Sequence, residues 1–368
     1  METSKTTINT QLQLKTISFL RFPLIVFVVL IHTQINSING VLSNGTIANT
    51  FGDAFPIYES ISYLFSHIIT RISVPLFFFI SGFLFFYKTP DFSLATYTTK
   101  LKKRIIRLLI PYLIWNILFI LSRNLPAIIS HGSTTQIIGE GYSITDWISA
   151  FWCYNSTESP VSYQLWFIRD LMVVILFTPL IYWLTKKIGY LLPLILGILW
   201  MTQVSLSIVG FSTEAFFFFT VGSFFSIKKK NFTELVKSHA TLLGIIYIVF
   251  VSITLLTKDF IWSIYIKRIS ILIGIPFAIA ISASLIEQGK WRVNHFLEES
   301  SFFIYAYHII VLPIVFRLLT SVIPCTSDIR ATLLYFLWAT TVIGVGLIIY
   351  YCLKKCIPKT TALLTGGK

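Results

Sequence analysis

The chain has 368 residues, of which 55% are hydrophobic, 16% aromatic and only 12% charged. This composition carries more apolar surface than a water-soluble domain can bury, which excludes a soluble enzyme and indicates a protein that crosses a membrane several times. The net charge of +14 does not require a nucleic-acid partner. Membrane proteins keep their Lys- and Arg-rich loops in the cytoplasm, and that bias accounts for the charge.

Apolar stretches of about 20 residues, the length of a helix that crosses a bilayer, recur along the chain. They predict ten transmembrane helices, of which the sixth is short. The fifth and sixth form either two full spans or one broken, re-entrant arrangement. The stretches lie near residues 17–36, 70–87, 105–122, 164–185, 188–207, 212–227, 239–257, 264–286, 301–322 and 331–353.

The loops between these stretches alternate in charge. One set carries most of the Lys and Arg residues, whereas the other holds only scattered cations such as Arg123, Lys258 and Arg330. Because the basic set stays in the cytoplasm, ten crossings place both termini inside. We therefore predict an all-α, polytopic integral membrane protein. We expect a single transmembrane domain over residues 1–368, with a core of about 15–353 and no appended soluble domain.

Arg21 and His32 lie within the first apolar stretch. Ionisable side chains at membrane depth are costly, and they mark functional sites by default. His32 lies eleven positions after Arg21, just over three helical turns. On a helix the two side chains therefore point the same way, roughly 16 Å apart along the axis. They either line one internal cavity or rest at the two interfaces, with Arg21 extended to the inner surface.

Two further groups of cationic residues flank the second and third stretches. Arg71 stands at the predicted outer end of the second span, where Ser81-Gly82 allows another helix to approach closely. Arg104 and Arg107 enter the third span on one helix face, and two guanidiniums suit a phosphate because each offers a planar fork of donors. The preference of cations for the cytoplasmic side explains the same pair without a ligand.

Other polar residues carry weaker signals. Arg169 and Asp170 are adjacent, so we expect them on different helix faces and without a joint catalytic role. Glu214 either hydrogen-bonds a sugar or faces water, and His308 is either part of a site or a hydrogen-bonded core histidine. Aromatic residues of the loop at 123–163 either anchor at the interface or stack on a sugar.

Cysteines and common motifs indicate neither a metal site nor a hydrolase. Cys153 and Cys325 fall in predicted outer loops, where an oxidising compartment permits a bond, but two isolated thiols are the favoured interpretation. No phosphate-binding loop, dinucleotide fingerprint, or serine or zinc hydrolase motif is present in the sequence. We expect no bound metal.

Taken together, the cationic residues resemble the acyltransferase 3 family of integral membrane proteins. The family's Arg, ten residues, His pattern falls on Arg21 and His32, and its Arg, three residues, Pro-x-Phe-Phe-x-Ile-Ser-Gly pattern falls on residues 71–82. Its Arg-x-x-Arg pattern falls on Arg104 and Arg107. Looser similarity covers residues 165–170 and 301–308, and the ten-span plan covers nearly the whole chain.

The resemblance implies an O-acyltransferase that moves an acyl group, commonly acetyl, from acyl-coenzyme A to a hydroxyl of a carbohydrate or glycan. It implies acyl-CoA (acetyl-CoA) as donor substrate with no permanently bound cofactor, and we expect the protein in a bacterial plasma membrane. His32 is the expected base. Arg21 would bind the donor or position the reacting groups, and Arg71 would steady the oxyanion or the acceptor. Arg104 and Arg107 would hold coenzyme A phosphates from the cytoplasmic side.

Two other functions fit the composition. A transporter or flippase of a glycan or lipid-linked sugar would also use buried charges and aromatics in a helical bundle. The unrelated membrane-bound O-acyltransferase type shares the reaction without these motifs. The ordered set of Arg and His motifs favours the acyltransferase 3 type, and it leaves open the acceptor, the acyl chain and the oligomeric state.

Overall fold

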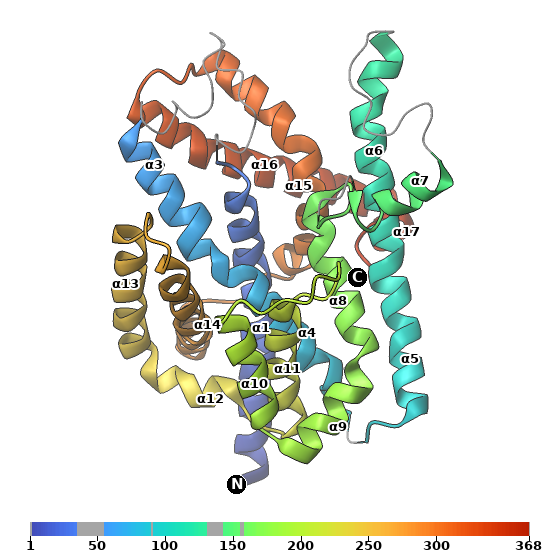
Figure 1. Ribbon diagram of the computed structural model, residues 1–368, viewed down its shortest axis with the longest axis vertical. Helices are drawn as coiled ribbons and strands as arrows, with labels where there is room; N and C mark the ends of the chain where they lie inside the picture. The colour runs from blue at the N-terminus through green and yellow to red at the C-terminus, as the bar shows by residue number, and fades with distance from the viewer. Residues whose placement is uncertain (1, 35–54, 90, 131–142, 155–157, 368) are drawn as a thin grey trace. The chain divides into compact units, whose positions relative to one another are not determined.

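The computed structural model describes residues 2–34, 55–89, 91–130, 143–154 and 158–367 (Figure 1). Every regular element in these ranges is a helix, which confirms the all-α prediction. Seven helical segments are long and apolar enough to cross a bilayer, or eight if a bent pair counts as one span, so this is an integral membrane protein. The seven are Thr10–Ile31, Pro56–Phe86, Leu94–Asn124, Phe232–Leu256, Ser263–Glu287, His295–Val322 and Asp328–Cys356.

The difference from the predicted ten lies in the middle of the chain. The stretch predicted as the fourth span is broken into Tyr163–Leu176 and Thr178–Ile188, which bend by 61°. Pro179 cannot continue the hydrogen-bond ladder, and the Thr178 hydroxyl donates to the Ile175 carbonyl that the break exposes, at 2.7 Å. The stretches predicted as the fifth and sixth spans form two shorter helices, α10 (Leu191–Met201) and α11 (Thr213–Ile227).

The residue contacts group the chain into two compact units. Unit 1 comprises residues 1–77 and 229–348, and unit 2 comprises residues 78–228 and 349–368. In unit 1, α1 packs against α14 and α15, and α13 packs along α14 (Figure 1). The helices of unit 1 are α1 (Glu2–Ile31), α3 (Pro56–Tyr63), α12 (Phe232–Val236), α13 (Ala240–Leu256), α14 (Ser263–Glu287), α15 (His295–Val322) and most of α16 (Asp328–Cys356).

The helix that carries Arg71 begins earlier than predicted. The apolar pattern predicts an outer loop for residues 56–69, but α3 already starts at Pro56. The Asp328 carboxylate accepts hydrogen bonds from the first backbone N–H groups of this helix, those of Ile57 at 3.0 Å and Tyr58 at 2.9 Å. Arg71 therefore lies inside a long helical segment, not at its end. A π turn, η3 (Leu64–Ile68), and a 3-10 turn, η4 (Ile69–Ile72), precede α4 (Ser73–Phe86).

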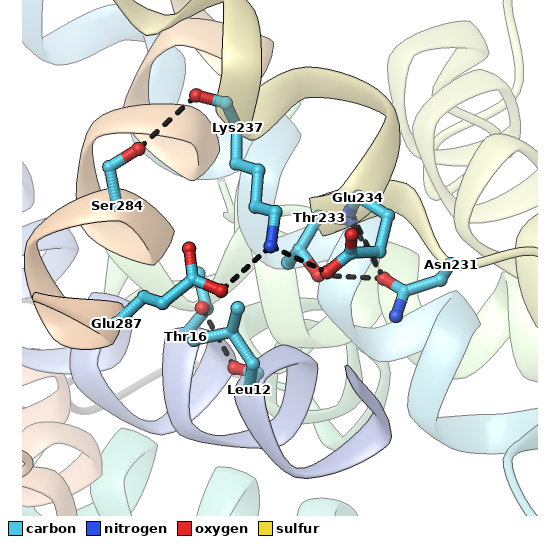
Figure 2. A network of polar contacts seen from close by, with 8 residues as sticks. All are labelled: Leu12, Thr16, Asn231, Thr233, Glu234, Lys237, Ser284 and Glu287. Carbon is cyan, nitrogen blue, oxygen red and sulfur yellow. Dashed lines mark hydrogen bonds and ion pairs between the residues drawn. The ribbon is translucent and has the colours of Figure 1, made fainter. Parts of the chain in front are cut away.

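A polar network joins α12, the 3-10 turn η8 (Lys237–His239) and the end of α14 (Figure 2). The Lys237 ammonium lies 3.0 Å from a Glu234 carboxylate oxygen and 2.7 Å from one of Glu287. Ser284 donates its hydroxyl to the Lys237 carbonyl, and Asn231 caps α12. This network fixes the last turn of α14, from which the chain turns toward α15.

Unit 2 depends on a close backbone contact between α4 and α11. A Cβ atom added to Gly82 would stand 2.0 Å from the Phe219 carbonyl oxygen, and one added to Gly222 would stand 1.9 Å from that of Phe79. The expectation that Ser81-Gly82 admits a neighbouring helix is confirmed. The remaining helices of unit 2 are α5 (Leu94–Arg104), η5 (Ile105–Leu109), α6 (Ile110–Ser130), α7 (Ile144–Ala150), η7 (Tyr163–Leu165), α8 (Trp166–Leu176), α9 (Thr178–Ile188) and α17 (Pro358–Leu364).

Candidate active site

His32 directly follows the last residue of α1, and hydroxyl groups fix this helix end. The carbonyl of Leu30 has no partner within the helix, and it accepts hydrogen bonds from Ser66 at 2.8 Å and from Tyr335 at 3.2 Å. The Thr33 hydroxyl also donates to this carbonyl, at 3.1 Å. Because these donors come from η3 and α16, three parts of unit 1 together determine where His32 lies.

The ring of His308 lies beside that of His32, with 5.4 Å between the ring centroids. His308 is fully buried, and its Nδ1 is 2.6 Å from the Tyr305 carbonyl oxygen and 3.2 Å from that of Ile304. Only an N–H group bonds to a carbonyl, so Nδ1 carries the proton and Nε2 keeps its lone pair. Within the described part of the chain, this buried Nε2 has no hydrogen-bond partner.

Arg71 belongs to the same region through a chain of hydrogen bonds. Its Nε donates to the Ser66 carbonyl at 3.0 Å, and its Nη2 donates to His67 Nδ1 at 3.2 Å. His67 then donates from Nε2 to the Gln34 side-chain oxygen at 2.7 Å. A neutral imidazole is the form of His32 that accepts a proton.

Arg21 contacts α15 as well, through an ion pair with Glu298. Arg21 Nη1 donates to Glu298 Oε1, which also accepts the Ser18 hydroxyl at 3.0 Å. The two charged side chains are 22% and 13% exposed, so the pair is largely shielded from water. Arg21 and His32 thus face the same neighbouring helix, as their spacing predicts.

The two contacts fix the relative direction of α1 and α15. His32 lies eleven positions after Arg21, and His308 lies ten positions after Glu298. The two helices are therefore parallel. The ion pair and the histidine pair are two contacts between them, separated by roughly 16 Å along the helix axis.

The structure places the other predicted residues in unit 2. Arg104 ends α5 with its guanidinium 5.9 Å from the Phe85 ring centroid, and Arg107 is exposed in the π turn η5. A π turn rotates by fewer degrees per residue than an α-helix, so these side chains diverge more around the axis than the predicted shared face assumes. Glu214 accepts a hydrogen bond from Trp200 at 3.3 Å.

Arg169 and Asp170 contact each other, which their expected places on different helix faces do not anticipate, while the expectation that they have no joint catalytic role stays a prediction. Both are 3% exposed, and Arg169 donates from Nε and Nη2 to Asp170 Oδ1 at 2.9 and 2.8 Å. The flexible Arg side chain folds back on its neighbour, which helix-face geometry does not anticipate. Arg169 also donates to the Trp152 carbonyl at 2.7 Å, so the pair fastens the loop before α8. Cys325 is a free thiol, so no disulfide joins Cys153 and Cys325.

A comparison with protein families decides the class of this protein. The family model described as an acyltransferase domain matches residues 14–353. The chain belongs to the acyltransferase 3 family. The match covers essentially the whole chain, so this membrane protein is an acyltransferase. No curated protein and no solved structure matches it.

The sequence interpretation of this acyltransferase missed several residues around His32. Ser66 and His67 were assigned to a loop, although His67 and Arg71 have the i, i+4 spacing of one helix face. Tyr335 carries no local signal, because its role depends on a contact with a residue distant in sequence. The sequence alone does not decide whether His308 belongs to a site or to the core, and the structure places its ring against that of His32.

We predict that Arg21 and Glu298 stabilise the acyltransferase as a coupled pair. Arg21→Gln and Glu298→Gln should each lower the free energy of unfolding by about 1–3 kcal/mol, because each leaves a shielded charge without its partner. The double variant should lose less than the sum of the two losses. Thermal unfolding in detergent measures this, with Lys290→Gln as an exposed control. Strictly additive losses would show that the pair contributes no coupling.

Proposed function

We propose that this protein transfers an acyl group, in the first instance acetyl, from acyl-coenzyme A to a hydroxyl of a carbohydrate or glycan at a bacterial plasma membrane. We further propose ten crossings, with both termini in the cytoplasm. The observation that supports this function best is the His32–His308 pair at the end of α1, in a chain of an acyltransferase family. An imidazole next to a second, oriented imidazole is suited to proton transfer at neutral pH.

In the proposed reaction His32 acts as general base. It takes the proton of the acceptor hydroxyl as the oxygen attacks the thioester carbonyl, and a C–O bond forms. The tetrahedral intermediate then expels the coenzyme A sulfur as the C–S bond breaks, and His32 returns the proton to the thiolate. The positive charge of Arg71 stabilises the negative oxygen of the intermediate.

His308 and Arg21 have positioning roles in this proposal. The Nδ1 proton of His308 is committed to backbone carbonyls, so its Nε2 lone pair is available to accept a hydrogen bond at the His32 ring. Arg21 is committed to Glu298 and holds α1 against α15. Of its two expected roles, this pairing favours positioning over binding of the donor.

His32→Ala should abolish acyl transfer while the protein still folds and inserts. Loss of a general base lowers the rate by about 10²–10⁴-fold. The measurement compares surface glycan masses from a deletion strain complemented with each variant, with His239→Ala, an exposed histidine, as control. Full glycan acylation in the His32→Ala strain would rule out His32 as the base. An unchanged glycan mass in the deletion strain itself would remove the glycan as acceptor.

His308→Gln should lower kcat with little change in KM for either substrate, because the ring that orients His32 is lost while the substrate contacts remain. Steady-state kinetics of the protein in nanodiscs measures both constants. An unchanged kcat would show that His308 contributes to packing alone.

Arg104 and Arg107 are proposed to bind phosphates of the donor. Arg104→Gln with Arg107→Gln should raise KM for acyl-coenzyme A about tenfold, with little change in KM for the acceptor, because two charge-assisted contacts are lost. Lys102→Gln with Lys103→Gln makes the same charge change on the exposed neighbours. Equal effects of the two double variants would mean that the Arg pair acts only through general charge.

A further inference from the structure

Unit 1 contains a cavity of about 520 Å³ beside the N-terminal half of α1. Its volume lies within the range of small-molecule and cofactor sites. Its walls come from α1, from the end of α14 and from the linker that leads into α15. The residues whose side chains bear on its chemistry are Lys15, Ser18, Trp291, Arg292 and His295.

The lining of the cavity combines cations with an aromatic ring. Lys15 and Arg292 supply two positive charges, His295 adds an imidazole, and no carboxylate belongs to the described lining. Trp291 stacks on Phe19 with 4.8 Å between ring centroids, yet 39% of its surface remains exposed. Cations bind phosphates, and an indole offers a flat face to a planar base. This combination fits a nucleotide.

The cavity is built into the fold. The Lys237–Glu287 ion pair holds the last turn of α14 next to the cavity residue Ile286 (Figure 2). Gly289 then takes a positive φ of 71°, which turns the chain toward the cavity linker. Asn294 caps α15 by accepting the Leu297 N–H at 3.2 Å. Lys15 and Arg292 are exposed like the neighbouring Lys290, but unlike Lys290 they line one cavity together with Trp291.

The cavity is also aligned with the proposed reaction centre. Ser18 lines it and donates to Glu298, so the Arg21–Glu298 pair lies directly next to it on the way to His32. Ser18 and His32 are fourteen residues apart, roughly 21 Å along α1. From its ribose to its sulfur, an extended coenzyme A measures on the order of 20 Å, counted along its covalent bonds.

We propose that this cavity binds the nucleotide end of the acyl-coenzyme A donor, with adenine on Trp291 and the ribose 3′-phosphate between Lys15 and Arg292. The inference rests on the proposed donor and assigns its ribose 3′-phosphate to this cavity, so that only the diphosphate is left to Arg104 and Arg107. The loops that flank the cavity are among the basic ones assigned to the cytoplasm, the compartment that supplies acyl-coenzyme A. The pantetheine arm then follows α1 past the ion pair and brings the thioester to His32.

The test measures binding of coenzyme A and of dephospho-coenzyme A, which lacks the 3′-phosphate, to the full-length protein in nanodiscs. The unaltered protein should prefer coenzyme A by about tenfold, because the missing phosphate removes contacts to Lys15 and Arg292. Lys15→Gln with Arg292→Gln should abolish this preference, and Trp291→Ala should weaken both ligands equally. Lys290→Gln removes one positive charge from a neighbouring residue outside the cavity lining and should leave the preference intact.

Other outcomes separate this inference from the proposed function. Preference retained in Lys15→Gln with Arg292→Gln would overturn the cavity assignment, while the acyltransferase proposal would stand if His32→Ala still abolished transfer. If these variants instead lost only a co-purified anionic phospholipid, the cavity would be a lipid site and the inference would be wrong. No binding of coenzyme A by the unaltered protein would refute the donor itself.

Discussion

The parallel contact between α1 and α15 is the constraint on which the rest of the proposed site depends. It is fixed at one level by the Arg21–Glu298 ion pair and at the other by the histidine pair. Helices in a bilayer gain little from apolar contact with each other, so polar contacts of this kind decide register. A shift of one helix by a single turn, about 5.4 Å, would separate both pairs at once. In the proposed mechanism, the ion pair therefore supports catalysis by holding His32 at the height of His308.

Departures from α-helical geometry place the polar residues of unit 1. The π and 3-10 turns at η3 and η4 interrupt the helix that carries Ser66, His67 and Arg71. Such turns change which side chains face the interior, and π turns are frequent at functional sites. Here they allow the Ser66 hydroxyl to reach the end of α1 while the Ser66 carbonyl accepts from Arg71. One short segment thus contacts both the end of α1, next to the proposed base His32, and the neighbouring cation Arg71.

Much of the membrane character was readable from the sequence, because long apolar stretches and charged loops are local signals. The same-face relation of Arg21 and His32 followed from helix periodicity alone. The start of α3 did not, because its exposed N–H groups are satisfied by Asp328, a residue more than two hundred positions away. The partnership of His32 with His308 was also hidden, since it depends on how two distant helices align. The Arg169–Asp170 contact was missed for another reason, namely that side-chain flexibility overrides the geometry of helix faces.

In the proposed mechanism, acyl groups are expected to cross the membrane plane, entering at the N-terminal half of α1 and leaving at His32. Sealed vesicles of known orientation, with unacylated glycan from a deletion strain enclosed at the face opposite the cytoplasmic one, test this directly. Acyl-coenzyme A supplied only at the cytoplasmic face should acylate the enclosed glycan. If acylation instead required both substrates at the cytoplasmic face, transfer along α1 would be contradicted.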